Sequence, residues 1–314
     1  MSTSYYIALD VGGTQLRAAC YPQNSTDPVM VRKISTQEGP ETPLQRLVNL
    51  IHSIWPQDGQ VKAIAAALPG AVDPYNGIIF IAPNIRGWVN LHLKEILSAE
   101  FNVPIGIGND ANLAALGEWK YGAGQGHQNL IYITISTGIG GGVISDGKLL
   151  LGAHGLAGEI GHITVQPDGP LCGCGQRGHL EAIAAGPGIV RWIREEIQNG
   201  QPTRLTNISE PLTARHVSEA AAQGDPLAIA ALERAGLYLG RGLADFLHIF
   251  NPSALILGGG VMRSGRLLLD PLHAALKKHV ISSQYTDNLV IRQAALGDDA
   301  GLMGALALAQ STNA

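Results

Sequence analysis

Short apolar runs alternate with helix-length amphipathic segments along most of the chain. The runs that predict strands are 5–9, 61–68, 103–108 and 130–135. The segments whose apolar spacing predicts helices are 90–101, 110–122 and 225–248. Because strands and helices that alternate in this way bury their apolar faces by packing as layers, the pattern predicts an α/β fold.

Two glycine-rich turns of similar design follow two of these strands. The first glycine turn, residues 12–14, follows a strand that delivers Asp10, and the second glycine turn, residues 137–138, follows the strand 130–135. Each could close an ordinary β-hairpin. The polar residue at each strand end favours phosphate binding, because glycine lets backbone N–H groups approach phosphate oxygens. The candidate phosphate-binding residues are Asp10, Gly12, Gly13 and Thr14 at the first glycine turn and Thr137 and Gly138 at the second.

Composition narrows the class of protein. The 314 residues are 46% hydrophobic and 15% charged, as in a globular chain with one large or two smaller domains, and the net charge of −4 argues against a nucleic-acid or anionic-membrane surface. The N-terminus has neither a basic region nor a long apolar run, so we expect no signal peptide. Three cysteines make no disulfide framework, which favours a reducing cytoplasm.

A third glycine run follows the strand-like segment 254–257. Gly258 and Gly259 could form a plain strand-to-helix turn, or could let a nucleotide base or ribose lie against the backbone. Gly173, Gly175 and Gly178 match G-x-G-x-x-G, but no clear strand precedes them, so we regard this match as accidental. A domain boundary is expected near residues 121–128.

Asn109 and Asp110 stand where a predicted strand ends and a predicted helix begins. Either side chain could cap the helix by accepting its first N–H groups. Asp110 could instead accept the proton of a hydroxyl that attacks a phosphoryl group. In the irregular segment 67–88, Gly70 and Asn84 have the character of loop residues near a ligand, on weak evidence.

Nitrogen and sulfur ligands gather between residues 162 and 179. His162, Cys172, Cys174 and His179 lie within eighteen residues, with a glycine-rich knuckle between them, which fits a closed tetrahedral zinc site. The alternative is two buried thiols and two unrelated histidines. With four protein ligands the zinc would be structural, and it would position the segment that carries Glu181 beside Glu159 and His162.

In their order and approximate spacing, these motifs resemble the ROK family of sugar kinases and sugar-responsive repressors, and within it the bacterial glucokinases. The resemblance rests on LDVGGTQLRAA, GNDANLAALGE, STGIGGGV, GEIGHITV, GPLCGCGQRGHLEA and LILGGGV, which together span almost the whole chain. It implies an actin-like ATPase fold of two RNase-H-like domains with a cleft between them. It also implies a small domain of residues 1–120 plus 298–314, completed by a returning C-terminal helix, and a large domain of residues 121–297.

The resemblance further implies roles for individual residues. Asp10 would lie in the Mg²⁺-phosphate region, the glycine turns would contact ATP phosphates, and Gly258 and Gly259 would contact adenosine. Asp110 matches the catalytic base. Residues that match sugar-hydroxyl contacts are Asn84, Asn109, Asp110, Glu159, His162 and Glu181, with Gly70 as a further candidate. His162, Cys172 and Cys174 match zinc ligands, and a homodimer is the family's usual assembly.

One departure from the family pattern concerns the fourth zinc ligand. His179 stands where the family has a cysteine, so the charge of the site changes from about minus one to about zero. The expected reaction is phosphorylation of a hexose at its 6-hydroxyl, with glucose as the first candidate. An N-acetylhexosamine or other hexose kinase is the alternative. A sugar-sensing repressor would carry a DNA-binding domain before Asp10, and a non-catalytic sugar-binding protein would not need two phosphate turns.

Overall fold

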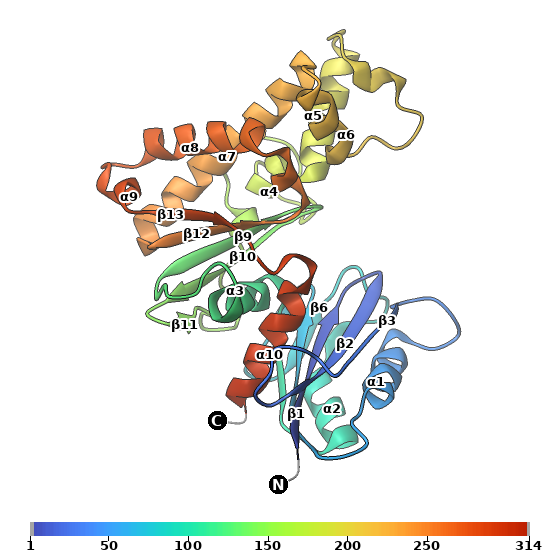
Figure 1. The fold of residues 1–314 in the computed structure, drawn as a ribbon. Coiled ribbons are helices and arrows are strands. Elements are labelled where there is room, and N and C mark those ends of the chain that lie inside the picture. The colour runs from blue at the N-terminus through green and yellow to red at the C-terminus, as the bar shows by residue number, and fades with distance from the viewer. Residues whose placement is uncertain (1–2, 313–314) are drawn as a thin grey trace. The chain divides into compact units, whose positions relative to one another are not determined.

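The computed structural model describes residues 3–312, which form two compact units (Figure 1). The first unit holds the chain up to Gly126, the segment Gly142–Gly158 and the chain from Ala295 onward, and the second unit holds His127–Gly141 and Glu159–Ala294. The domain limits expected from the sequence, 120/121 and 297/298, remain a prediction. The α/β class is confirmed, because each unit contains a sheet together with helices.

The sheet of the first unit has the strand order β3-β2-β1-β4-β8. Its strands are β1 (Ser4–Val11), β2 (Gln15–Pro22), β3 (Met30–Ser35), β4 (Gln60–Leu68) and β8 (Ile105–Asn109). The three strands β1, β2 and β3 pair antiparallel, whereas β4 pairs parallel to both β1 and β8. The predicted strands at 5–9, 61–68 and 103–108 are therefore confirmed.

Both faces of this sheet are buried, which explains the nearly continuous apolar runs of its central strands. On β1, Ile7 and Leu9 belong to one core cluster and Tyr6 and Ala8 to another. The first cluster includes residues of α1 (Pro43–Ser53) and α2 (Leu93–Phe101), and the second includes residues of α3 (Asp110–Tyr121) and α10 (Ala300–Thr312). The second face is rich in alanine, so α3 and α10 can approach the strands closely.

A buried carboxylate joins two segments of the first unit that are far apart in the sequence. Glu118 of α3 is fully buried and accepts hydrogen bonds from the backbone N–H of Ala123 at 2.8 Å, Ala295 at 3.1 Å and Leu296 at 2.8 Å. Ala123 lies just after α3, and Ala295 and Leu296 lead into α10. Glu118 therefore fixes the end of α3 and the start of the C-terminal segment of the first unit at one point.

Segment 67–88, expected to be irregular, contributes instead to a small antiparallel sheet, so that expectation was wrong. Its strands are β5 (Ala71–Asp73), β6 (Ile78–Ile81) and β7 (Val89–Leu91). Asp73 closes the turn between the first two by accepting from the backbone N–H of Tyr75 at 2.9 Å and of Asn76 at 3.1 Å. Strands of three or four residues are too short to show a clear alternation in the sequence.

A second sheet repeats the strand order of the first, as β11-β10-β9-β12-β13. Its strands are β9 (Leu130–Ile135), β10 (Ile139–Ser145), β11 (Lys148–Leu149), β12 (Ala254–Gly258) and β13 (Val290–Gln293). The end of β10 and all of β11 fall in the segment Gly142–Gly158 of the first unit, and the other strands fall in the second unit. The helices that follow are α4 (Leu180–Ala184), α5 (Gly186–Gln198), α6 (Ala214–Ala222), α7 (Pro226–Phe250), α8 (Arg266–His279) and α9 (Gln284–Asp287).

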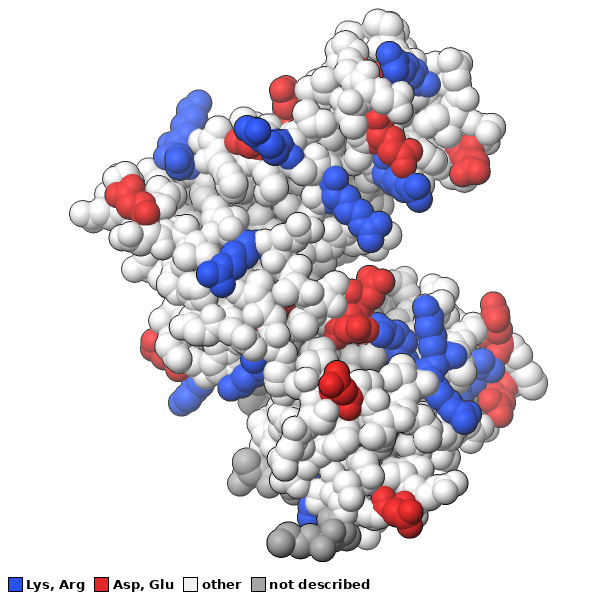
Figure 2. All heavy atoms as spheres, viewed as in Figure 1, with Lys and Arg blue, Asp and Glu red and all other residues white. Residues whose placement is uncertain are grey.

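The longest helix, α7, confirms the helix predicted at 225–248. Asp225 caps it by accepting from the backbone N–H of Ala228 at 2.9 Å, and also accepts from the Thr203 hydroxyl at 2.9 Å and the Arg204 N–H at 2.8 Å. None of the helices within residues 3–312 combines the length and apolar content that a membrane crossing requires. On the face drawn in Figure 2, basic and acidic side chains are interspersed.

Candidate active site

The first glycine turn is held by the residue that follows β3. The Gly12 N–H donates to the Gln15 carbonyl at 2.8 Å, which closes the turn between β1 and β2. Thr36 is fully buried, its hydroxyl donates to the Gly12 carbonyl at 2.7 Å, and its N–H donates to the Thr14 carbonyl at 2.9 Å. These bonds therefore fix the conformation of the turn.

Gln37 joins the first glycine turn to the loop that carries Asn84. Its side-chain Nε2 donates to the Gly13 carbonyl and to the Asn84 carbonyl, both at 2.9 Å, and its Oε1 accepts from the Arg86 N–H at 3.3 Å. A Cβ on Gly13 would lie 2.7 Å from the Asn84 Cβ, so only glycine permits this approach. Sequence reasoning missed both Thr36 and Gln37, because no local motif marks them.

Asp10 lies near the end of β1, directly opposite Arg17 of β2. The Asp10 carboxylate and the Arg17 guanidinium are 3.6 Å apart, and Arg17 also binds Asp299. Burial raises the pKa of Asp10 above its usual range, Arg17 opposes that shift, and the carboxylates of Asp299 and Asp298 add to it. A second positive group at this carboxylate would therefore be favourable.

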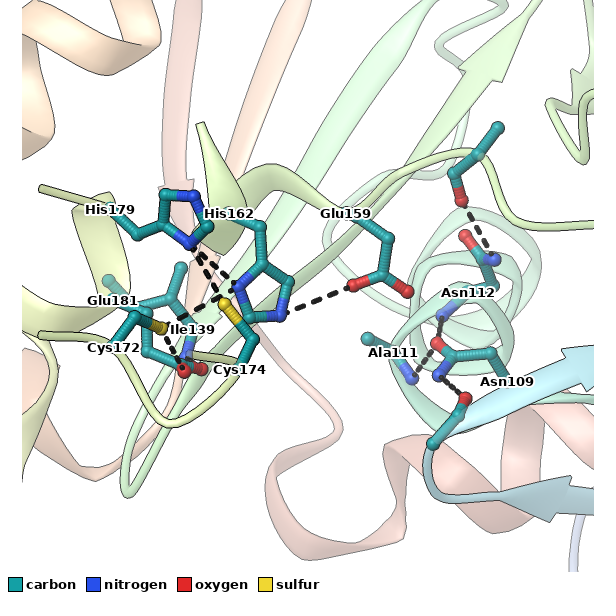
Figure 3. A network of polar contacts seen from close by, with 12 residues as sticks. Asn109, Ala111, Asn112, Ile139, Glu159, His162, Cys172, Cys174, His179 and Glu181 are labelled. Carbon is teal, nitrogen blue, oxygen red and sulfur yellow. Dashed lines mark hydrogen bonds and ion pairs between the residues drawn. The ribbon is translucent and has the colours of Figure 1, made fainter. Parts of the chain in front are cut away.

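The structure separates the roles of Asn109 and Asp110. Asn109 is the N-cap of α3, because its Oδ1 accepts from the N–H of Ala111 at 3.0 Å and of Asn112 at 3.1 Å (Figure 3). Its Nδ2 donates to the Gly70 carbonyl at 3.2 Å. Asp110 is exposed at the first helical position, and its Oδ1 also accepts from the Ala111 N–H at 2.8 Å. Asn109 is therefore the N-cap, and Asp110 shares one of its N–H donors.

The second glycine turn is held by a charged side chain instead. The Glu181 Oε2 accepts from the Ile139 N–H at 3.0 Å and lies 2.7 Å from where a Cβ on Gly138 would be. The other carboxylate oxygen of Glu181 accepts from the Cys172 thiol at 3.5 Å. Glu181 therefore links the turn at Thr137 and Gly138 to the cysteine-bearing loop.

Gly258 and Gly259 lie at the end of the second sheet where the second glycine turn also lies. The strands β9 and β12 are parallel neighbours, so their carboxyl ends meet at one edge. Gly259 has a φ of 89°, and a Cβ there would be 2.2 Å from the Ile135 carbonyl oxygen. Ligands of α/β sheets bind at such edges, where loops leave adjacent strands.

The loop from His162 to His179, called the Cys/His loop below, brings its four candidate ligands together. One ligand atom from each of His162, Cys172, Cys174 and His179 lies within 4.8 Å of all the others, and Figure 3 shows the side chains turned toward one another. The two Nδ1 atoms are 3.3 Å apart. The Cys174 Sγ is 3.3 Å from the His179 Nδ1, and the Cys172 Sγ is 3.8 Å from the His162 Nδ1.

These distances fit a tetrahedral ion. Bonds of about 2.0–2.1 Å to nitrogen and about 2.3 Å to sulfur place tetrahedral zinc ligands ~3.3–3.8 Å apart. Burial raises the pKa of the Cys172 thiol to about 11, so a thiolate there needs a cation beside it. With three contacts at these distances and all four ligand atoms within 4.8 Å of one another, the donor set is that of a candidate metal site.

His162 has a partner on each side of its ring. Its Nδ1 faces the cluster, and its Nε2 lies 3.9 Å from the Glu159 carboxylate. Burial raises the pKa of Glu159, the His162 ring opposes that shift, and Glu181 adds to it. A carboxylate on the far nitrogen of a ligating histidine fixes the orientation of the ring.

The predicted site residues thus form two groups, each within one unit. In the first unit the structure brings Gly13 to Asn84 and Asn109 to Gly70, with Asp110 at the adjacent helix start. In the second unit it brings together Gly138, Glu181, the Cys/His loop and, through His162, Glu159.

Proteins of known activity are similar to this chain over nearly its full length. A glucokinase of Thermotoga maritima is 34% identical over 310 residues, covering 96% of each chain. A crystal structure of a ROK family glucokinase from Streptomyces griseus, in complex with glucose and AMPPNP, has a TM-score of 0.79 and 35% identity and covers 98% of this chain and 99% of that one. A xylose repressor of Bacillus subtilis is 30% identical over 304 residues, which is 96% of this chain and 75% of the repressor.

The repeated sheet and the matched structures define an actin-like ATPase fold. The model of the ROK family matches residues 6–312, and the chain belongs to that family.

Proposed function

We propose that this chain is an ATP-dependent glucokinase that transfers the γ-phosphoryl group of ATP to the 6-hydroxyl of glucose. The glucokinase relatives support this activity, and the observation that carries it is the state of Asp110. Asp110 is exposed at the first position of α3, directly after the cap residue Asn109. A general base must reach the proton that it accepts, and an exposed carboxylate at the start of a helix can do so.

Asp110 accepts the proton of the 6-hydroxyl as that oxygen attacks the γ-phosphorus, and the bond from phosphorus to the β–γ bridging oxygen breaks. The N–H groups of the two glycine turns, which Thr36 and Glu181 hold in place, receive negative charge on the phosphate oxygens. Asp10 is the carboxylate that would hold Mg²⁺, which neutralises phosphate charge when bound. Gly258 and Gly259 offer backbone to the adenosine.

The sugar contacts come from both groups of residues. Asn84, Asn109 and the backbone at Gly70 offer amide and carbonyl groups in the first unit, and Glu159, His162 and Glu181 offer charged or ring groups in the second. Carboxylates accept bonds from sugar hydroxyls, and the Nε2–H of His162 can donate one. These side chains hold the sugar; they take no proton in the reaction.

The Cys/His loop would hold one structural Zn²⁺ through His162, Cys172, Cys174 and His179. The ion fixes the loop and thereby the position of Glu181, which lies two residues after the ligand His179. The two thiolates need reducing conditions, so we place the protein in the cytoplasm. We expect a homodimer, which is the usual assembly of the family.

A spectrophotometric assay with ATP, Mg²⁺ and a panel of hexoses tests the proposal. Glucose should give the highest kcat/KM, and N-acetylated hexoses should give lower values. If an N-acetylhexosamine is the better substrate, the enzyme class stands and the substrate is wrong. If no sugar yields ADP but sugars still bind, the chain is a sensor, like the repressors it also resembles.

A further inference from the structure

A cavity of about 320 Å³ in the second unit has no part in the proposed reaction. It lies against the Cys/His loop, α5 and α7, and none of the nucleotide or sugar residues named above lines it. Its size is at the lower limit for small-ligand sites, which suits a small, polar molecule. Three arginines line it, Arg177 from the loop, Arg191 from α5 and Arg234 from α7.

The positive charge of this cavity is incompletely neutralised. Arg191 pairs with Glu195 at 3.7 Å, whereas the salt bridges of the described residues include neither Arg177 nor Arg234. The lining holds three arginines against two carboxylates, Asp168 and Glu195. The cavity therefore carries one net positive charge and attracts anions.

The geometry of Arg234 also favours an anionic ligand. Its guanidinium lies 5.9 Å from the ring centre of Trp192 and 5.1 Å from that of Tyr238. The rings fix its plane without using its N–H donors, which leaves a flat fork suited to phosphate oxygens. Burial lowers the pKa of Arg234, so an anion beside it would relieve an unfavourable charge.

An unpaired acceptor completes the site. The Gln166 side-chain Oε1 is buried and has no hydrogen-bond partner, and Gln166 also lines the cavity. Buried polar atoms normally have a partner, so this oxygen indicates a missing donor. A hydroxyl group of a ligand would supply it, and an ester that carries several hydroxyl groups offers more such donors than the single P–OH of a phosphate dianion.

We propose that this cavity binds a small phosphate ester that also carries hydroxyl groups, such as a phosphorylated sugar or polyol. Arg177 and Arg234 bind the phosphate, and Gln166 accepts from a hydroxyl. Arg191, which also lines the cavity, donates to the carbonyl of Ala182, the residue after Glu181, so the cavity lies near the residue that holds the second glycine turn. The site is thus placed to report the level of phosphorylated sugars to the enzyme.

Isothermal titration calorimetry with glycerol 3-phosphate, inorganic phosphate and glycerol tests the site. Titrations are run with and without saturating glucose and AMPPNP, so that binding at the proposed active site is separated from binding here. The ester should bind with a dissociation constant below about 10 mM, more tightly than phosphate, and glycerol should not bind. No binding of the ester, or equal affinity for ester and phosphate, overturns the proposal.

Substitutions locate the binding. Arg234→Gln and, separately, Arg177→Gln should each weaken the ester at least about ten-fold, because each removes a charge-assisted contact. Gln166→Leu should weaken the ester but not phosphate. The matched control is Arg194→Gln, which removes an exposed arginine of α5 outside the cavity and should change nothing. If Arg177→Gln, the change least able to disturb folding, leaves ester affinity unchanged, the proposed site is wrong.

Discussion

The two glycine turns leave sheets of the same strand order, yet different chemistry holds them. Neutral groups hold the first turn, because Thr36 and Gln37 donate to its carbonyl oxygens from the end of a neighbouring strand. A carboxylate holds the second turn, because Glu181 accepts from the Ile139 N–H and also contacts Cys172. The first turn is therefore independent of any metal, and the second is coupled to the Cys/His loop.

This difference indicates that the units contribute unequally to the proposed reaction. The first unit supplies the base and a rigid phosphate cradle built from its own sheet. The second unit supplies a turn whose position depends on an ion in a neighbouring loop. Substitutions in the first unit should leave metal content unchanged, whereas loss of the metal should affect both sugar and nucleotide binding.

The largest expected effect comes from the first unit. Asp110→Asn should lower kcat by about 100- to 10,000-fold, because it removes the general base while Asn109 still caps α3. The glucose dissociation constant and the zinc content should change little. Steady-state kinetics, calorimetry and elemental analysis measure all three. Asp58→Asn, at an exposed position in the same unit, is the control, and near-normal turnover of Asp110→Asn would refute the mechanism.

The second largest effect is expected from the loss of a zinc ligand. Wild-type protein should contain about one zinc per chain, and His179→Ala should lower zinc affinity by at least about 10- to 100-fold. The KM for glucose, and through Glu181 that for ATP, should rise before kcat falls.

His179→Cys keeps four ligands and is the matched control, with zinc and activity retained. Elemental analysis, chelator-release rates and kinetics separate the variants. A metal-free wild type with full activity would falsify the zinc assignment, as would an alanine variant with unchanged zinc content and KM.

A smaller effect is expected at Gln37. Gln37→Ala should raise the KM for both ATP and glucose by about 3- to 10-fold, since it removes the bonds that join Gly13 to the Asn84 loop. Gln37→Glu should be worse, because it places a carboxylate against two carbonyl oxygens. Zinc content should not change, and the exposed neighbour Glu38→Gln is the control. A rise in only one KM would show that Gln37 does not join the two loops.

The smallest expected effect concerns Asp225, which caps α7 in the second unit and is not one of the metal-ligand candidates. Burial would raise the pKa of Asp225, but hydrogen bonds from Arg204, Ala228 and Thr203 lower it overall. The carboxylate therefore stabilises the fold above the ordinary pKa of aspartate, near 3.8, and this contribution is lost as pH falls through the lowered value.

Asp225→Asn should accordingly lower Tm by no more than about 4 °C at pH 7, with a difference that shrinks as the pH falls below 3.8. Thermal melts of zinc-loaded and chelated protein, across that pH range, measure it. A difference that grows on acidification contradicts the assignment of the pKa shift.

Elements and residues that a short-range sequence pattern specifies could be predicted. Residues whose role depends on contacts between distant segments could not. The central strands, the helix at α7 and the cluster of His162 and Cys172 follow from apolar spacing or local motifs, and the structure contains all of them. Thr36 and Gln37 lie in an ordinary polar stretch and gain their role only because β3 ends beside the first glycine turn. The link from Glu181 to Ile139 likewise joins residues 42 positions apart.

The return of α10 to the first unit has a consequence for biosynthesis. The ribosome makes β1 and β4 early, but the helix that covers their alanine-rich face follows every residue of the second unit. Until α10 emerges, that apolar face and the carboxylate of Glu118 lack their native partners, so the nascent first unit is exposed to aggregation and a target for chaperones. A stop codon shortly before Ala295 would therefore leave the first unit without part of its core, although every residue of its sheet would still be present.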